Sequence, residues 1–205
     1  MRLGLLGGSF DPVHLGHLIM AECCRQQCGL DAVWFLPTAV PPHKQDIRLT
    51  PAEHRVAMLE LAVAGNPAFS VCRCEIDRGG VSYTVDTLER LRDEQPDREL
   101  FFLVGADMLL DLPHWRDAVR VCQLATPVAV GRPGCAIDFE VLRAIASPER
   151  IAEIRRCQVE MPEIGLSSTQ LRRRVEAGQS IRYWTPSAVE MYIKMHGLYE
   201  KMPRV

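Results

Sequence analysis

Short apolar runs alternate with segments of helical periodicity along most of the chain. Several runs are apolar at successive positions rather than at every second one, which is typical of strands that are buried on both faces. Proline, glycine and polar residues end the runs, as they commonly end strands. The pattern predicts strands at Arg2–Leu6, Ala32–Leu36, Phe69–Ile76, Leu100–Val104, Pro127–Val130 and Cys157–Met161.

Helical spacing of apolar residues fills the segments between these runs. One helix is expected to begin at Thr50-Pro51-Ala52-Glu53, which has the form of a capping box with proline at the first helical position, and to end near Ala64. The other predicted helices are Leu15–Cys28, Thr84–Glu94, Pro113–Cys122, 138–155, Gln170–Ala177 and Pro186–His196.

Alternation of strands and helices predicts a parallel sheet with helices on both faces. We find no repeat, low-complexity segment or linker, so we expect one doubly wound α/β domain over residues 1–205. Ligands of such sheets bind beyond the carboxyl ends of the strands. The loops to inspect are therefore 7–17, 37–50, 77–86, 105–115, 131–135 and 162–169.

Composition narrows the class of protein. The 205 residues are 47% hydrophobic and 24% charged, which is typical of a globular protein, and the net charge of −2 argues against a broad nucleic-acid-binding face. Asp11 and Pro12 interrupt the N-terminal apolar run before it could form a signal peptide, and no stretch approaches the ~18 apolar residues of a membrane span. The eight cysteines form no C-x-x-C pair. We therefore expect a cytoplasmic protein with reduced thiols and with neither nucleic acid nor membrane as a partner.

The loop after the first predicted strand carries the strongest chemical signal. It reads Gly7-Gly8-Ser9-Phe10-Asp11-Pro12-Val13-His14-Leu15-Gly16-His17. Glycines let the backbone approach a ligand closely, and the start of the next helix offers free N–H groups to phosphate. His14 and His17 are three residues apart, so both rings can face one phosphate group and donate to it as charge develops. The alternatives are a helix cap with a surface histidine, or a zinc site that lacks an obvious third ligand.

This loop resembles the H-x-G-H signature of the nucleotidylyltransferase superfamily, in the form found in adenylyltransferases that make NAD and coenzyme A precursors. Together with further motifs, in the same order, it is similar to the bacterial nicotinate-nucleotide adenylyltransferases. The resemblance extends from residue 2 to about residue 195. The further motifs are Pro41-Pro42-His43-Lys44, Gly79-Gly80-Val81-Ser82-Tyr83-Thr84, Gly105-Ala106-Asp107 with Trp115, Gly131-Arg132-Pro133-Gly134, and Leu166-Ser167-Ser168-Thr169 with Arg172.

The resemblance implies adenylyl transfer from ATP to nicotinate mononucleotide, which gives deamido-NAD and pyrophosphate. His14 and His17 would be catalytic, Lys44 would bind phosphate, and Mg²⁺ would accompany ATP with no protein ligand assigned. Lys44 could instead be a solvated loop residue. The residues expected to bind ATP are Gly7, Gly8, Ser9, Phe10, Gly105, Ser167, Ser168, Thr169 and Arg172.

A second group would bind nicotinate mononucleotide, with Trp115 as a platform for the pyridine ring and Asp107 near ribose hydroxyls. The group is Ser82, Tyr83, Thr84, Asp107, Trp115 and Arg132. The start of the helix at Thr84 offers N–H groups to a carboxylate on the ring. Each assignment has a structural alternative: Trp115 as a core residue, and Thr84 or the serines at 167 and 168 as simple helix caps.

Three other functions remain to be weighed. A related enzyme could adenylylate phosphopantetheine or nicotinamide mononucleotide, or the chain could bind nucleotides without chemistry. The intact histidine pair disfavours the last of these. The missing G-x-G-x-x-G fingerprint disfavours an NAD-dependent oxidoreductase. The sequence leaves a homo-oligomer open.

Overall fold

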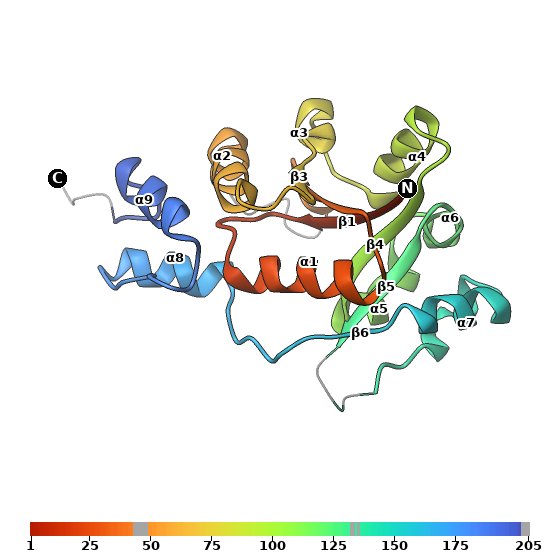
Figure 1. The fold of residues 1–205 in the computed structure, drawn as a ribbon. Helices are drawn as coiled ribbons and strands as arrows, with labels where there is room; N and C mark the ends of the chain where they lie inside the picture. Colours follow the sequence, from red (N-terminus) through yellow and green to blue (C-terminus); the bar gives the residue numbers. More distant parts are fainter. Residues whose placement is uncertain (43–48, 132–133, 135, 202–205) are drawn as a thin grey trace.

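The computed structural model describes residues 1–42, 49–131, 134 and 136–201. Its centre is a six-stranded sheet in the order β3-β2-β1-β4-β5-β6, in which every neighbouring pair is parallel (Figure 1). The strands are β1 Arg2–Gly8, β2 Ala32–Pro37, β3 Phe69–Val71, β4 Glu99–Gly105, β5 Thr126–Gly131 and β6 Val159–Glu160.

Helices cover both faces of this sheet. α1 runs along one face, and α8 and α9 lie at the end of the molecule away from the N-terminus (Figure 1). The α-helices are α1 Leu15–Gln27, α2 Ala52–Val63, α3 Cys74–Arg78, α4 Thr84–Glu94, α5 Ala106–Asp111, α6 Ala118–Leu124, α7 Pro148–Arg156, α8 Ser168–Glu176 and α9 Ser187–Met195. Two 3₁₀ helices, η2 Leu112–His114 and η3 Glu140–Ala144, complete the described elements.

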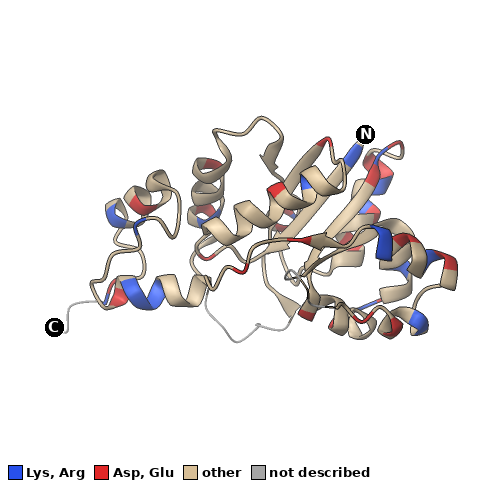
Figure 2. Ribbon diagram, turned by 60° about the horizontal axis from the view of Figure 1, so that its bottom comes forward, with Lys and Arg blue, Asp and Glu red and all other residues tan. Residues whose placement is uncertain are grey.

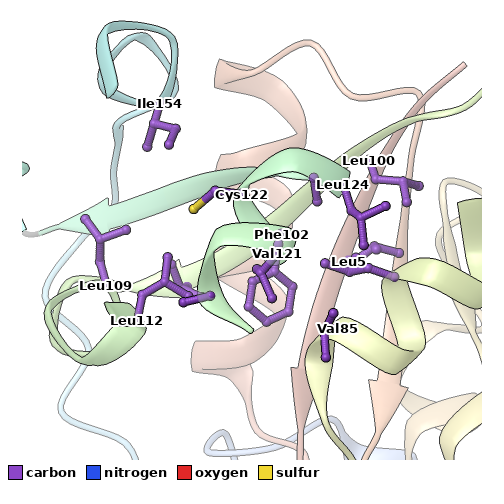
Figure 3. Packing of buried hydrophobic residues seen from close by; sticks show 14 of the residues in the cluster. Leu5, Val85, Leu100, Phe102, Leu109, Leu112, Val121, Cys122, Leu124 and Ile154 are labelled. Atoms are coloured by element: carbon purple, nitrogen blue, oxygen red, sulfur yellow. The ribbon is translucent and has the colours of Figure 1, made fainter. Parts of the chain in front are cut away.

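Successive residues of the central strands enter two separate hydrophobic clusters. Phe102 packs in one cluster with residues of α4, α5 and α6, whereas Phe101 packs in the other with residues of α1, α2 and α9. Figure 3 shows the first cluster, to which both Phe102 of β4 and Val121 of α6 belong. Burial of a phenylalanine side chain contributes about 1.5–3 kcal/mol to the stability of the fold. Both faces of the sheet therefore contribute to the hydrophobic core. The predicted doubly wound parallel sheet is therefore confirmed; the prediction of one domain over residues 1–205 stays a prediction.

The strand predicted at Phe69–Ile76 is wrong in its second half. β3 ends at Val71, and residues Cys74–Arg78 form α3 instead. The neighbouring strand explains the early end, because β2 stops at Pro37, which has no N–H to continue the ladder. The last bond on this side joins Cys72 N–H to the carbonyl of Phe35.

Two predicted helices are interrupted by caps. Leu112–His114 is a 3₁₀ turn, and α6 begins only after Asp117, whose side chain accepts from the Arg120 N–H at 3.3 Å. The segment 138–155 divides into η3 and α7 because Ser147 caps α7 and Pro148 occupies its first turn. Helical periodicity alone did not reveal these breaks.

The capping box predicted at Thr50 is also wrong. α2 starts at Ala52 without a side-chain cap, and the Thr50 N–H donates to Asp11 Oδ2 at 3.2 Å. Glu53, the expected partner in the box, pairs with Arg73 at 2.9 Å. Besides α3, the helix α5 was missed, since it begins directly after Gly105 where a loop was expected.

Charged residues are spread over the outer surfaces of the helices. Figure 2 shows both signs intermixed over much of the chain, with a block of basic residues on α8. Pairs such as Arg120 with Glu89, at 3.0 Å, match the signs locally. Among the described helices, none combines the length and the apolar character that a membrane span requires.

Candidate active site

The candidate site lies between β1 and β4, where the strand order of the sheet reverses. β1 and β4 are neighbours, yet α1 follows β1 onto one face and α5 follows β4 onto the other. Such a switch point leaves a crevice beyond the carboxyl ends of the two strands. Gly7 and Gly8 end β1 at this crevice, and Gly105 ends β4.

His14 and His17 stack on each other at the start of α1. Their ring centroids are 3.7 Å apart with an interplanar angle of 21°. Gly16 makes this arrangement possible, because a Cβ at that position would lie 3.0 Å from His14 Nδ1. The H-x-G-H spacing thus has a steric reason in this fold.

Hydrogen bonding defines the proton position on His17. The backbone N–H of His14 donates to His17 Nδ1 at 3.2 Å. Nδ1 is therefore the acceptor of the neutral ring, and the proton resides on Nε2. His17 in this form keeps Nε2–H as a donor.

Desolvation keeps both imidazoles neutral. Burial lowers the pKa of His14 from 6.5 to about 4. Burial, followed by repulsion from His14, lowers the pKa of His17 to about 3. Nδ1 of His14 is buried without a hydrogen-bond partner among the described residues, so nothing offsets its desolvation. At neutral pH the pair is uncharged and offers N–H dipoles rather than full positive charges.

Phe10 packs against the histidine pair. Only 1% of Phe10 is exposed, and its ring meets the His17 ring edge-on at 5.0 Å. Its φ of 46° is rare for a residue with a side chain and persists only where the surroundings hold it. Its ring therefore packs against His17, and the predicted contact of Phe10 with ATP stays a prediction.

The start of α8 lies against the loop between β1 and α1. Ser168 donates its hydroxyl to the Pro12 carbonyl at 2.8 Å, and Arg172 donates to the Asp11 carbonyl at 2.6 Å and to Thr169 Oγ1 at 3.3 Å. Ser167 caps α8 by accepting from the Gln170 N–H. The structure therefore brings the two predicted phosphate-binding segments together, while Ser167 has the cap role that was the alternative. Their contact with ATP stays a prediction.

Three residues that the sequence reading missed hold the same loop. Arg55, 2% exposed, donates to the carbonyls of Thr50 and Ser9, both at 2.9 Å. Tyr199 and Thr185 reach the loop from the C-terminal part of the chain. Arg55 could have been noticed, because it shares a helical face with the apolar residues three and four positions later.

On the other side of the crevice, Ser82 joins two loops. It is buried, its hydroxyl accepts from the Ala39 N–H at 3.0 Å, and its N–H donates to the Val40 carbonyl at 2.9 Å. An isolated bridge between Val40 and Val81 runs beside these bonds. Ser82 therefore joins the two loops through hydrogen bonds, and its predicted contact with the pyridine nucleotide stays a prediction.

Arg116, the residue after Trp115, contacts both Tyr83 and Asp86 around the start of α4. The guanidinium of Arg116 lies 4.5 Å from the ring centroid of Tyr83 and 3.5 Å from the carboxylate of Asp86. α4 begins at Thr84 with no side-chain cap, which leaves its first N–H groups for another acceptor.

Trp115 is half-buried. It meets Phe102 edge-on at 5.6 Å and donates to Asp111 at 3.2 Å. Its inner edge is part of the core, as the alternative held. The next residue, Arg116, contacts Tyr83.

Asp107, Lys44 and Arg132 remain among the predicted binding residues. Asp107 is exposed in the first turn of α5, at the carboxyl end of β4. Lys44 and Arg132 lie outside the described residues. Within the described part of the chain, no group of three or more His, Cys, Asp or Glu side chains is placed to hold a metal ion.

Comparison with known proteins assigns the family. The model of the cytidylyltransferase-like family matches residues 5–174. A relative from Thermus thermophilus, named probable nicotinate-nucleotide adenylyltransferase, is 47% identical over 199 residues, which is 97% of this chain and all of that protein. One from Thermomicrobium roseum with the same name is 44% identical over 200 residues, covering 97% of this chain and 91% of the relative.

Solved structures support the fold. The Plasmodium falciparum nicotinic acid mononucleotide adenylyltransferase complexed with APC aligns with a TM-score of 0.75 at 17% identity, covering 97% of this chain and 96% of that one. The same fold thus accompanies the sequence matches. The chain belongs to the cytidylyltransferase-like family, in its group of nicotinate-nucleotide adenylyltransferases.

Proposed function

We propose that this protein transfers the adenylyl group of ATP to nicotinate mononucleotide. The observation that carries the proposal is the match of 47% identity over nearly the whole chain to a relative named for this reaction. The paired neutral histidines at the switch point of the sheet agree with it, because adenylyl transfer needs fixed hydrogen-bond donors rather than a protein nucleophile.

The chemistry is a direct displacement. A 5′-phosphate oxygen of nicotinate mononucleotide attacks the α-phosphorus of ATP, the bond from that phosphorus to the bridging oxygen breaks, and pyrophosphate leaves. Negative charge then grows on the α-phosphate oxygens and on the departing pyrophosphate. We propose that His14 and His17 donate to these oxygens, and the neutral state of both imidazoles, each of which keeps one N–H donor, supports this role. We propose that Arg172 and the start of α8 receive the outer phosphates.

The pyridine end would lie against Trp115 and the start of α4. The exposed part of the Trp115 ring provides an apolar surface for stacking. The uncapped N–H groups at Thr84 suit the nicotinate carboxylate, which accepts from two donors. We propose that Asp107, which is exposed at the carboxyl end of β4, contacts ribose hydroxyls.

Mg²⁺ is proposed to accompany ATP. The described residues provide no cluster of carboxylates for a resident metal ion, and the Asp11 carboxylate already accepts from Tyr199 and Thr50. Phosphate oxygens and water are the ligands that Mg²⁺ prefers, so we assign it no protein ligand. It would screen the triphosphate charge.

A three-substrate assay tests the proposal. ATP and Mg²⁺ are supplied with nicotinate mononucleotide, nicotinamide mononucleotide or phosphopantetheine, and the dinucleotide and pyrophosphate are quantified. We expect equal amounts of deamido-NAD and pyrophosphate with the first substrate. Product with phosphopantetheine alone would move the chain to the related enzyme class, and binding of ATP without any product would make it a nucleotide-binding module.

A further inference from the structure

We propose that Tyr199 and Thr185, in the C-terminal part of the chain, are positioning residues that hold the histidine loop, residues 9–14, in its active geometry. Both lie beyond residue 174, where the match to the family model ends. The proposal therefore concerns a part of the chain that the family match does not describe.

Tyr199 acts on the carboxylate that anchors the loop. Its hydroxyl donates to Asp11 Oδ1 at 2.6 Å, while the other oxygen, Oδ2, accepts from the Thr50 N–H at 3.2 Å. Asp11 is only 3% exposed and lies three residues before His14. Because a buried carboxylate is costly unless both oxygens are satisfied, the tyrosine hydroxyl helps to determine where this residue sits.

Thr185 acts on the last carbonyl before the histidines. Its hydroxyl donates to the Val13 carbonyl at 2.8 Å, and Thr185 is 2% exposed. The adjacent Trp184 carbonyl accepts from the Leu15 N–H at 2.9 Å, at the first turn of α1. The C-terminal segment thus contacts the chain immediately before and immediately after His14.

The charges around the loop favour this arrangement. Arg55 lies near Asp11 and Tyr199, and the guanidinium of Arg172 bonds to the Asp11 carbonyl. Burial and the neighbouring Asp11 raise the pKa of Tyr199, so its hydroxyl stays a donor throughout the working range. The histidines are uncharged in the same surroundings.

A loop held in this way excludes water from the two imidazoles. It also keeps their N–H groups pointing in one direction. The hydroxyl bonds of Tyr199 and Thr185 to the loop form a brace. Loss of this brace would therefore change two properties at once: turnover and the solvation of His14 and His17. A residue that only stabilises the fold would change neither at temperatures where the protein remains folded.

Tyr199→Phe removes the hydroxyl and keeps the ring. Displacement of a reacting group by about 1 Å can cost roughly 100-fold, so we expect kcat to fall by about 10- to 100-fold. The value of kcat/KM should fall equally, because the loss concerns the transition state. Titration of the imidazoles by NMR should show the pKa values of His14 and His17 rising from about 4 and about 3 toward 6.5.

Tyr192→Phe is the matched control. Tyr192 belongs to α9, and its hydroxyl bonds to His54 at 2.9 Å, away from the histidine loop. The control therefore loses one tyrosine hydroxyl bond in the same part of the chain. It should keep both kcat and the two histidine titrations of the wild type.

Thr185→Val is a second variant that tests the same proposal if Tyr199→Phe does not fold. It keeps the volume of the side chain and leaves the Val13 carbonyl without its donor, so kcat should fall and the histidine pKa values should rise. Wild-type kcat and unshifted titrations in a folded variant would overturn the proposal. The expected changes in kcat rest on the proposed function, whereas the titrations need no substrate. A protein that is inactive on nicotinate mononucleotide would therefore contradict the proposed function, and its histidine titrations would still test the brace.

Discussion

The two sides of the crevice are held by different means. One side, which is proposed to bind the phosphates and is called the phosphate side here, is the histidine loop. Four of its carbonyls accept from side chains of other elements: Ser9 from Arg55, Asp11 from Arg172, Pro12 from Ser168 and Val13 from Thr185. On the other side, proposed to bind the pyridine ring and called the pyridine side, Tyr83 and Trp115 are held by ring contacts, a backbone bridge and the exposed cation of Arg116. The first side is fixed through its backbone, the second through half-exposed rings.

This difference corresponds to two tasks. Charge that develops during phosphoryl chemistry is stabilised best by donors that do not reorient, which requires a rigid backbone. Recognition of a flat ring needs an apolar surface and a few donors at its edge, and it tolerates more adjustment. We therefore expect changes on the phosphate side to affect turnover and changes on the pyridine side to affect KM.

The largest effect is expected at His17. His17→Ala removes the Nε2–H donor, and kcat should fall by about 10²–10³-fold, which is the scale for losing one such donor. His17→Asn is the matched variant, since its Oδ1 can replace Nδ1 as acceptor for the His14 N–H without replacing Nε2. Steady-state kinetics should show the same loss of kcat in both variants. Only the alanine variant also loses the acceptor for the His14 N–H at the start of α1, so only that variant should be less stable. Near-wild-type turnover in either would remove His17 from the catalytic residues.

The second effect concerns stability and pH. The folded-state pKa values of about 4 for His14 and about 3 for His17 lie below 6.5, so the unfolded chain binds protons first as the pH falls. The contribution of the neutral pair is therefore fully present above pH 6.5 and decreases below it, by about 1.4 kcal/mol per histidine at pH 5.5. Urea unfolding of wild type and His17→Asn at pH 7.5 and 5.5 measures this. A wild type that loses no more stability than the variant would contradict the low pKa of His17.

The smallest effect is expected at Trp115. Ring stacking is worth roughly 0.5–1.5 kcal/mol beyond the buried area, so Trp115→Ala should raise KM for the pyridine nucleotide several-fold and leave KM for ATP nearly unchanged. Because the inner edge of Trp115 packs on Phe102, thermal unfolding must accompany the kinetics. Equal weakening of both substrates would identify Trp115 as a core residue alone.

Much of this site could be predicted from sequence because its signals are local. Glycines that end β1, a histidine pair at the start of a helix and apolar runs without alternation each need only a few neighbouring residues to be recognised. The sheet, the position of the crevice and the pairing of His14 with His17 followed from such patterns.

The supports of the histidine loop could not be predicted in the same way. Tyr199 lies 188 residues after Asp11, and Arg55 lies 46 residues after Ser9. No periodicity records which distant hydroxyl will satisfy a buried carboxylate. The bond between Ser82 and Ala39 also went unnoticed, because the two residues are 43 positions apart in the sequence.

The central claim is that the pyridine side selects a carboxylate through the uncapped start of α4. In the proposed binding mode a carboxylate would accept from two N–H donors there, whereas a carboxamide would have to place its own NH₂ against one of them. The direct measurement is kcat/KM for nicotinate and nicotinamide mononucleotides with saturating ATP. We predict a preference of at least ~10²-fold for the acid, below the ~10⁴-fold that fully buried, mismatched donors can produce. Comparable values for the two nucleotides would contradict the claim.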